Sequence, residues 1–167
     1  MSFRIRPFQK ADFEVLWQID QVCFDSQLAY SRPELALYMR RPGSYTLVAE
    51  SSDQAGGGNP APPTKILGFI VAEVRRSAGH IITIDVMPGS RRAGIGSALL
   101  RAAEEQARHA GACLVELETA VDNMAAIHFY KREGYFVEKT VPGYYSNSLD
   151  ALVMSKPLAP APAMPSR

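Results

Sequence analysis

The stretch IDVMPGSRRAGIGSALL, residues 84–100, joins a short apolar strand to a basic, glycine-containing turn and then to the start of a helix. The free amides at a helix N-terminus and the positive end of the helix dipole bind anions. Gly94 and Gly96 lack the Cβ atoms that would hold a pyrophosphate away from those amides. The stretch therefore predicts a phosphate-binding turn followed by a long helix.

Two common phosphate-binding motifs do not fit this turn. A loop of the GxxxxGK[ST] type needs a Lys-Ser/Thr pair after its glycines, and the dinucleotide fingerprint GxGxxG does not occur. Two glycines near a helix start are more often structural punctuation than a ligand site. Arg91, Arg92 and the preceding strand favour the ligand site here.

Outward from the turn, hydrophobic periodicity predicts both strands and helices. We expect strands at 3–7, 45–50, 66–74, 80–86, 112–119, 135–141 and 151–155, and helices at 10–23, 32–39, 94–110 and 122–132. Ala11-Asp12 and Ser31 are the expected helix caps. The predicted class is α/β (α+β), with a central sheet of six to seven strands, mixed but mostly antiparallel, and about four flanking helices.

The length fits one domain, because domains usually run to about 100–150 residues and the chain has 167. We expect this domain to span residues 1–158. Residues 51–64, SSDQAGGGNPAPPT, are expected to form a flexible Gly/Pro-rich loop, because they cannot bury enough apolar surface to offset the entropy of ordering them. Residues 159–167 are expected to be a disordered tail.

The composition indicates a globular protein, with 47% hydrophobic and 21% charged residues. The 18 Lys and Arg balance 17 Asp and Glu, so no net field favours nucleic acid or an anionic membrane as the main partner. No run approaches the ~18 apolar residues of a membrane span, and no apolar signal core follows Met1. We therefore expect a cytoplasmic protein with no nucleic-acid or membrane partner.

The cysteines and histidines do not have the spacing of metal ligands. Cys23 and Cys113 lie far apart without a CxxC motif, which favours buried or idle thiols in a reducing compartment over a disulfide or a metal site. His80, His109 and His128 are each expected to be surface or packing residues. No metal is expected.

The strand expected at 112–119 places two carboxylates on one face. Period-two geometry puts Leu114, Glu116 and Glu118 together, opposite Cys113 and Val115. Side chains two residues apart on a strand lie roughly 6–7 Å from each other, and like charges at that range can raise one pKa toward the range useful for a base. The alternative is that both are solvated surface acids.

The helix expected at 122–132 aligns an amide with a phenol. Asn123, Ile127 and Tyr130 are spaced i, i+4 and i+7, so Asn123 and Tyr130 share a face about 10 Å apart along the axis. Spacing alone leaves open that Asn123 is a helix cap and Tyr130 a half-buried core aromatic.

The motif Arg91-x-x-Gly94-x-Gly96 after a strand resembles the coenzyme A motif of the GNAT acetyltransferase superfamily, R/Q-x-x-G-x-G/A. LET at 117–119, DN at 122–123 and AIHFY at 126–130 resemble the bacterial ribosomal-protein alanine N-acetyltransferases. The resemblance implies a single GNAT-like domain whose sheet splays at the coenzyme site, with acetyl-CoA as co-substrate. It assigns coenzyme contacts to Ile84, Asp85, Val86, Arg91, Arg92, Ala93, Gly94, Ile95, Gly96, Ser97, Asn123 and Tyr130.

By the same resemblance Glu118 is the general base and Tyr130 the general acid. An α-amine with pKa near 8 must lose a proton before it attacks a thioester, and the leaving thiolate then needs one, which a phenol of pKa about 10 can supply. GYY at 143–145 resembles a turn that borders the peptide groove of that family. The expected substrate contacts are Phe24, Tyr30, Glu118, Tyr144 and Tyr145.

The resemblance also implies a bulge in the strand at 84–86, which would free an amide near Val86 to act as an oxyanion donor. Asp85, unusual inside an apolar run, either marks that bulge or is a surface residue on an edge. Direct attack in a ternary complex needs no protein nucleophile, and Cys113 points away from the Glu118 face by strand parity.

Three functions remain open at this point. The first is acetylation of the N-terminal α-amine of a protein or peptide, such as a ribosomal protein. The second is acetylation of a small amine, a polyamine or an antibiotic, for which the segment from Phe24 to Tyr30 offers only Asp25 as an acidic group. The third is a non-catalytic acetyl-CoA-binding module, which would have lost Glu118 and Tyr130, yet both are present.

Overall fold

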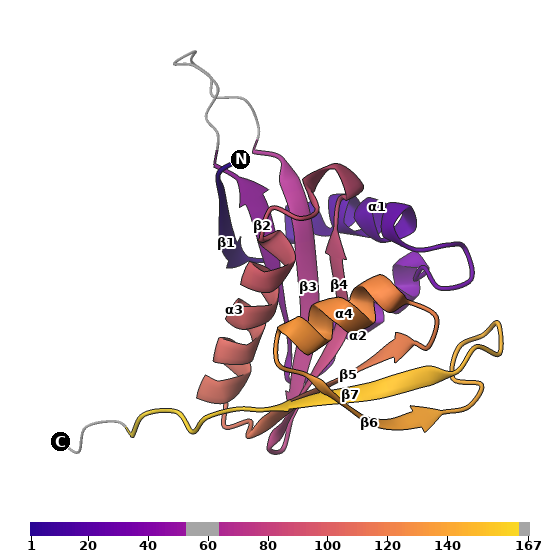
Figure 1. Ribbon diagram of the computed structural model, residues 1–167. Helices are drawn as coiled ribbons and strands as arrows, with labels where there is room; N and C mark the ends of the chain where they lie inside the picture. Colours follow the sequence, from indigo (N-terminus) through magenta and orange to yellow (C-terminus); the bar gives the residue numbers. More distant parts are fainter. Residues whose placement is uncertain (53–63, 164–167) are drawn as a thin grey trace, which may run out of the picture. The chain divides into compact units, whose positions relative to one another are not determined.

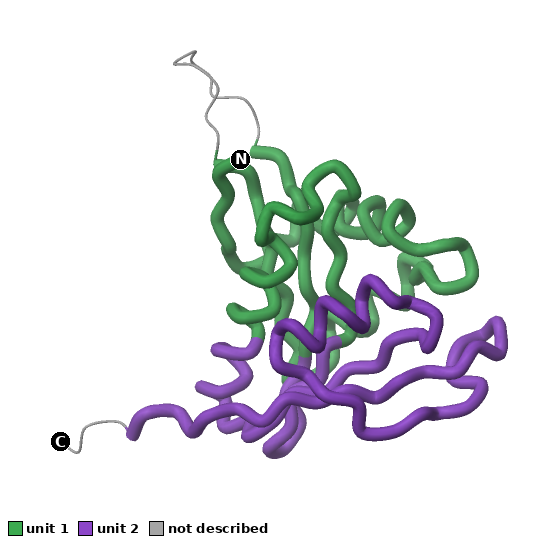
Figure 2. Tube along the Cα trace, viewed as in Figure 1, with its two compact units in different colours: residues 1–72, 82–103 green, residues 73–81, 104–167 purple. Residues whose placement is uncertain are grey.

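The computed structural model describes residues 1–52 and 64–163. Contacts between residues divide it into two compact units (Figure 2). Unit 1 comprises residues 1–72 and 82–103, and unit 2 comprises residues 73–81 and 104–167. Most of the loop predicted at 51–64 and the end of the predicted tail lie outside the described residues.

The elements follow the order expected from the sequence (Figure 1). The strands are β1 (Phe3–Pro7), β2 (Ser44–Ser51), β3 (Ile66–Arg75), β4 (Ala78–Val86), β5 (Leu114–Ala120), β6 (Phe136–Val141) and β7 (Ala151–Pro157). The α-helices are α1 (Phe13–Cys23), α2 (Arg32–Arg40), α3 (Ile95–His109) and α4 (Met124–Arg132), and the short 3₁₀ turns are η1 (Lys10–Asp12) and η2 (Pro88–Ser90).

The strands hydrogen-bond in the order β1-β2-β3-β4-β5-β7-β6 and form one open sheet. β4 and β5 are parallel, whereas β1 with β2, β5 with β7 and β6 with β7 are antiparallel. The predicted class is therefore confirmed: an α/β fold with a mixed, mostly antiparallel seven-stranded sheet and four α-helices in the described part of the chain. The predicted domain limit at residue 158 stays a prediction.

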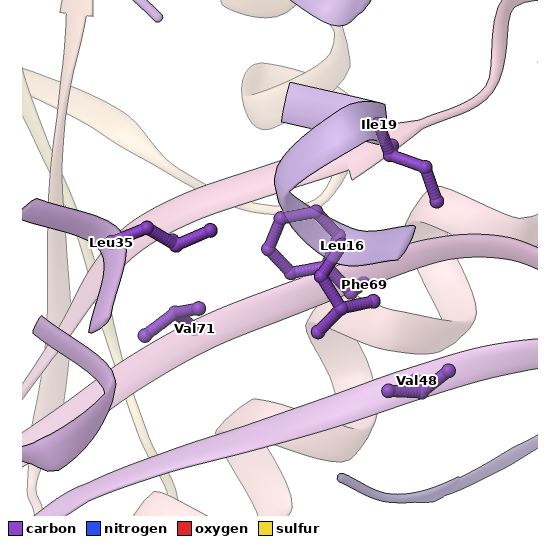
Figure 3. Close-up of a cluster of buried hydrophobic side chains, with 6 residues drawn as sticks. All are labelled: Leu16, Ile19, Leu35, Val48, Phe69 and Val71. Carbon is purple, nitrogen blue, oxygen red and sulfur yellow. The ribbon is translucent and has the colours of Figure 1, made fainter. Parts of the chain in front are cut away.

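Unit 1 is built around an apolar cluster beneath α1 and α2. Leu16 and Ile19 of α1 and Leu35 of α2 pack against Val48 of β2 and against Phe69 and Val71 of β3 (Figure 3). Strand alternation turns Tyr45 to the other face of β2, where its hydroxyl donates to the carbonyl of Ala103 in α3. Figure 1 shows α1 and α2 behind these strands and α3 in front.

The two predicted helix caps had different outcomes. Ser31 caps α2, because its side chain accepts the Glu34 amide while the Glu34 carboxylate accepts the Ser31 amide in return. Asp12 is the N-cap residue of α1, as expected, but its side chain makes no capping hydrogen bond to that helix. Its carboxylate accepts the Gln9 amide at 2.8 Å and pairs with the Arg6 guanidinium, so it is buried as a partner of β1.

Unit 2 holds the carboxyl-terminal strands, α4 and the second half of α3. Along β5 the side chains alternate between half-buried and buried, as the period-two prediction required. Glu104 of α3 is buried, and its carboxylate accepts the Tyr135 hydroxyl at 3.0 Å and the Lys156 ammonium at 2.9 Å. This network ties α3 to Tyr135, directly before β6, and to β7 within the unit.

No helix in the described part of the chain is long and apolar enough to cross a membrane. The expected cytoplasmic location stays a prediction. Cys23 and Cys113 are both free thiols; Cys23 is half-buried and Cys113 is exposed.

Candidate functional site

The turn before α3 has the geometry expected of an anion site in unit 1. Arg92 and Gly94 both have left-handed backbones, with φ of 62° and 81°. The first amide of this segment with a helical acceptor is that of Ala98, which donates to the Gly94 carbonyl at 3.0 Å. The amides of Ile95, Gly96 and Ser97 therefore precede the helical ladder, at the positive end of a 15-residue helix.

The surface of the turn leaves space for a ligand. A Cβ atom at Gly94 would meet nothing within 4 Å, and residues 91–94 are all exposed. Arg91 ties the turn to the end of β4, because its Nε donates to the Val86 carbonyl at 3.0 Å. The chain thus supplies a cradle of backbone amides flanked by two guanidinium groups, which suits a diphosphate.

The register of β3 and β4 supports an irregularity where the sequence predicts a bulge. A two-residue turn joins the strands, so Arg75 lies opposite Ala78 and a regular ladder would place Leu67 opposite Val86. Instead the Met87 amide donates to the Leu67 carbonyl at 2.9 Å. β4 therefore carries one residue more than β3 over this length, as a bulged strand does.

A close approach of the two backbones lies at the same point. A Cβ atom at Gly68 would lie 2.5 Å from the Asp85 carbonyl oxygen and 3.2 Å from the Val86 Cα. Only a residue without a side chain fits on β3 at this position. The predicted oxyanion amide near Val86 stays a prediction.

Asp85 is not the surface residue that the sequence left as an alternative. Its side chain is 1% exposed and faces Asp20 of α1. Thr83 donates its hydroxyl to Asp85 Oδ1 at 2.7 Å. Any part that Asp85 plays in coenzyme binding would therefore use its backbone.

In unit 2, Glu118 of β5 is paired with His80 of β4. Nε2 of His80 lies 2.6 Å from Oε2 of Glu118. The parallel ladder sets the two strands at this spacing, with His80 opposite Glu116 in register. The side chains of His80 and Glu118 are 32% and 22% exposed, so the pair is reachable by solvent or an acceptor. The sequence had treated His80 as a surface or packing residue; it is a partner of the candidate base.

A second carboxylate lies on the other side of His80. Oε1 of Glu73, on β3, is 3.7 Å from Nδ1 of His80. Glu73 is buried, and its Oε2 has no hydrogen-bond partner in the described part of the chain. Burial lowers the pKa of His80, but the hydrogen bond and charge of Glu118 and the charge of Glu73 outweigh it and raise the pKa above its ordinary value.

The predicted substrate turn at 143–145 lies within reach of the Glu118 charge. Burial, Tyr144 and the Glu118 charge raise the pKa of Tyr145 to about 12, so its phenol stays neutral. The rings of Tyr144 and Tyr145 stack edge to face at 5.0 Å. The turn is held by the Tyr145 amide on the Leu149 carbonyl and by the Gly143 amide on the Asp150 carboxylate.

Asn123 and Tyr130 both take the structural roles that spacing had left open. Asn123 caps α4, because its Oδ1 accepts the Ala126 amide at 3.1 Å. Tyr130 is 7% exposed, and its ring packs against Phe129 and Tyr135 at 5.2 and 5.8 Å. Their coenzyme and acid roles stay predictions.

The predicted acceptor segment of unit 1, residues 24–30, is anchored at its end. The Tyr30 carbonyl accepts Trp17 Nε1 at 3.1 Å and Gln21 Nε2 at 2.7 Å, and the Tyr30 ring packs against Tyr38 at 5.2 Å. The carboxylate of Asp25 accepts the amides of Gln27 and Leu28. Asp25 therefore serves the loop itself, and Phe24 is half-buried at its start.

The predicted residues fall into two groups. Residues 84–86 and 91–97, with Phe24 and Tyr30, belong to unit 1, while Glu118, Asn123, Tyr130, Tyr144 and Tyr145 belong to unit 2. Sequence reasoning missed the site positions of His80 and Glu73. The period-two pattern of β4, which places the polar His80 on the same face as Ile82 and Ile84, was a signal that could have identified His80. No cluster of three or more potential metal ligands occurs in residues 1–52 and 64–163.

Comparison with known proteins places the chain in a family. The protein-family model described as "Acetyltransferase (GNAT) family" matches residues 13–135 of this chain. An N-alpha-acetyltransferase of Sulfurisphaera tokodaii is 40% identical over 81 residues, which cover 48% of this chain and 48% of that protein. The chain spans about half the length of the curated relatives it matches.

Solved structures share the fold over nearly the whole chain. Ard1 of Thermoplasma volcanium has a TM-score of 0.79 and 28% identity, covering 95% of this chain and 99% of that one. The ribosomal-protein-S18-alanine N-acetyltransferase of Escherichia coli has a TM-score of 0.79 and 21% identity, covering 96% of each chain, a likeness of fold alone. Because the family match runs from α1 through the turn before α3 to the end of α4, this chain belongs to the acetyltransferase (GNAT) family.

Proposed function

We propose that this protein transfers the acetyl group of acetyl-CoA to the N-terminal α-amine of a protein or peptide, a ribosomal protein being one candidate. The observation that carries the proposal is the contact of 2.6 Å between Glu118 and His80, in a chain of an acetyltransferase family. It supplies a solvent-accessible proton acceptor of the kind that amine acetylation requires.

The turn of unit 1 would bind the co-substrate. The amides of residues 95–97 and the guanidinium groups of Arg91 and Arg92 would hold the diphosphate, and open space at Gly94 would admit it. Ile84, Asp85 and Val86 would offer backbone groups to the rest of the coenzyme. An amide near Val86 would stabilise the oxyanion, a contribution of about 3 kcal/mol in comparable sites.

Glu118 and His80 would then activate the acceptor. The ammonium group of the acceptor passes one proton to the Glu118 carboxylate, directly or through water, and the free amine attacks the thioester carbonyl. His80, hydrogen-bonded to the same carboxylate and partly exposed, gives that proton a path to solvent. The C–S bond breaks, Tyr130 donates its phenolic proton to the leaving thiolate, and the second proton of the attacking nitrogen passes through water to the Tyr130 phenolate, which leaves a neutral amide and a neutral phenol.

Two observations favour an α-amine acceptor over a polycation. Asp25, the one acidic side chain of residues 24–30, is committed to the amides of Gln27 and Leu28. The other candidate lining residues, Phe24, Tyr30, Tyr144 and Tyr145, are aromatic, which suits the side chains of a peptide. The name of the Sulfurisphaera tokodaii relative, an N-alpha-acetyltransferase, points the same way.

The proposal is tested with short peptides and acetyl-CoA, read by thiol release. Each peptide is made with a free and with a blocked N-terminus, with and without an internal Lys, and a polyamine and an aminoglycoside are run beside them. We expect release only with free N-termini. Equal rates on blocked peptides with Lys would move the reaction to side-chain amines, and release only with the small amines would move it to that class. No release with any amine, despite acetyl-CoA binding by calorimetry, would leave a binding module.

A further inference from the structure

Asp20 of α1 and Asp85 of β4 form a carboxyl pair inside unit 1. The side chains are 0% and 1% exposed. Oδ1 of Asp20 and Oδ2 of Asp85 are both buried, and neither has an N–H or O–H donor among the described residues. Cys23, one turn after Asp20 on α1, donates its Sγ to the carbonyl of Val86, the residue after Asp85, at 3.4 Å, so the two carboxyls lie against each other and a hydrogen bond between them would satisfy both oxygens. Carboxylates only accept hydrogen bonds, so this contact exists only when one of the two carries a proton.

The surrounding donors decide which carboxyl holds the proton. Oδ2 of Asp20 accepts the Tyr30 amide at 2.7 Å and the Gln21 side-chain amide at 3.3 Å, which stabilises a negative charge on Asp20. Among the described residues, the Thr83 hydroxyl is the one donor to Asp85 outside the pair, at 2.7 Å. Burial and the Asp20 charge hold the pKa of Asp85 well above its ordinary range. Asp85 is therefore the acid and Asp20 the anion of the pair.

Three other ionisable groups face the pair. The Arg91 guanidinium, at the end of β4, opposes the rise in the pKa of Asp85, and Glu34 of α2 adds to the burial that raises the pKa of Asp20. Burial and the charge of Asp85 raise the pKa of the Cys23 thiol, so it stays protonated. No Lys or Arg donates a hydrogen bond to Asp20 or Asp85 in the described part of the chain, so the shared proton is what neutralises the contact.

The pair connects two segments that take part in the proposed reaction, the acceptor segment and the end of β4. On the Asp20 side, the Tyr30 main chain is fixed by its amide to Asp20 and by its carbonyl to Trp17 and Gln21. On the Asp85 side, the next carbonyl, that of Val86, accepts Arg91 Nε at 3.0 Å and Cys23 Sγ at 3.4 Å. α1 and this part of β4 both lie in unit 1 (Figure 2).

The bulge explains why Asp85 reaches α1. Ile82 packs against the core beneath α1 and α2, so regular alternation would turn Asp85 to the opposite face of β4. Met87, five residues after Ile82, packs against the same core, so the alternation of β4 reverses between these two residues, as the extra residue indicated by the Met87–Leu67 hydrogen bond predicts, and Asp85 lies within this stretch.

We propose that Asp20 and Asp85 are positioning residues that share one proton across α1 and β4 and thereby hold the acceptor segment, residues 24–30, in register with the bulged strand end at Val86. This relative position would align the acceptor with the acetyl group, a consequence that rests on the proposed function. The proton-sharing contact itself does not. When the proton is lost, two buried anions face each other and the contact breaks.

The test compares wild type, Asp85→Asn and Thr83→Val from acid to alkaline pH. Asp85 is an acid in the fold but ionised when unfolded, so its stabilisation is full below the unfolded pKa of about 3.9 and declines as the pH rises through its folded pKa, by about tenfold in the folding constant per pH unit. Denaturation should show this decline in wild type and not in Asp85→Asn, whose amide donates to Asp20 at every pH. In Thr83→Val the decline should extend to higher pH, because the lost hydroxyl stabilised the Asp85 anion.

Two further readouts separate this inference from the proposed function. Infrared spectra of the folded protein at neutral pH should contain a protonated-carboxyl C=O band that Asp85→Asn removes, whether or not the protein turns over any substrate. If acetyl transfer is found, the KM for the acceptor should rise with pH in wild type at constant KM for acetyl-CoA, and Asp85→Asn should abolish that rise. The pair is overturned if all three proteins show the same decline or if Asp85→Asn loses no carboxyl band. If Asp85→Asn fails to fold, a decline in Thr83→Val that coincides with that of wild type overturns it.

Discussion

Nε2 of His80 and Oε2 of Glu118 lie 2.6 Å apart on the neighbouring parallel strands β4 and β5. This contact distinguishes Glu118 from Glu116, which lies two residues earlier on the same face of β5 and has the same chemistry. Glu118 is therefore the carboxylate of this face that can pass a proton to His80.

Replacing Glu118 with Gln should lower kcat about a hundredfold or more, as loss of a general base does. The residual activity should need a higher pH, because the acceptor amine must then ionise unaided. A pH–rate profile with acetyl-CoA and a peptide measures both effects. Glu116→Gln is the matched control, and its kcat should stay close to that of wild type. An equal loss of kcat in the control would show that the negative charge on this face of β5 matters, and not a general base at Glu118.

His80→Gln should remove a pH dependence of stability. The folded-state pKa of His80 is raised, so the stabilisation from its pairing is full below the unfolded pKa of about 6.5 and is lost as the pH rises through the raised value. Because the pair is partly exposed, we expect a change of about 1 kcal/mol. Chemical denaturation from pH 5 to pH 9 measures it, and identical pH curves for both proteins would refute the prediction.

Tyr130→Phe should lower turnover by about one to several powers of ten while leaving acetyl-CoA affinity within a few fold, since it removes only the proton donor. Single-turnover kinetics and calorimetry measure the two quantities. Tyr135 provides the control, because its ring packs 5.8 Å from that of Tyr130 and its hydroxyl serves Glu104. Tyr135→Phe should cost about 1 kcal/mol of stability with little change in turnover. An unchanged rate in Tyr130→Phe would remove that residue from the acid role.

Gly94→Ala should weaken acetyl-CoA binding about tenfold or more, because the methyl group enters the space proposed for the diphosphate. The same substitution at Gly111 separates this effect from backbone strain. Both glycines have left-handed φ, 81° and 93°, and open space around them, so each variant should lose about 1–2 kcal/mol of stability. Only Gly94→Ala should lose affinity in calorimetry; equal affinities would place the diphosphate elsewhere.

Gly68→Ala should destabilise the fold by about 1–3 kcal/mol, because its methyl group meets the Asp85 carbonyl and the backbone must shift. The displaced strand end should also lower kcat more than it changes acetyl-CoA affinity. Thermal melting and steady-state kinetics check both. Gly89→Ala adds the same atom where nothing lies within 4 Å, and its melting temperature should match wild type.

Much of the fold and part of the site follow from local pattern. Glycines and arginines after an apolar strand were enough to predict the turn before α3, because a helix start and its free amides are set by the few residues around them. Ser31 with Glu34 fixed the start of α2, and period-two alternation put Glu118 on the half-buried face of β5. Each of these features depends on neighbours within one or two turns of chain.

Tertiary structure alone decided which of those groups meet. His80 reaches Glu118 across 38 positions of sequence because β4 and β5 are neighbours in the sheet, and Asp20 reaches Asp85 because α1 packs on the bulged end of β4. Asp12 occupies the expected N-cap position of α1, but its carboxylate pairs with Arg6 of β1 instead of capping the helix. Periodicity states which face a side chain takes but not what lies opposite it, since strand order, register and helix docking are set by packing of the whole core.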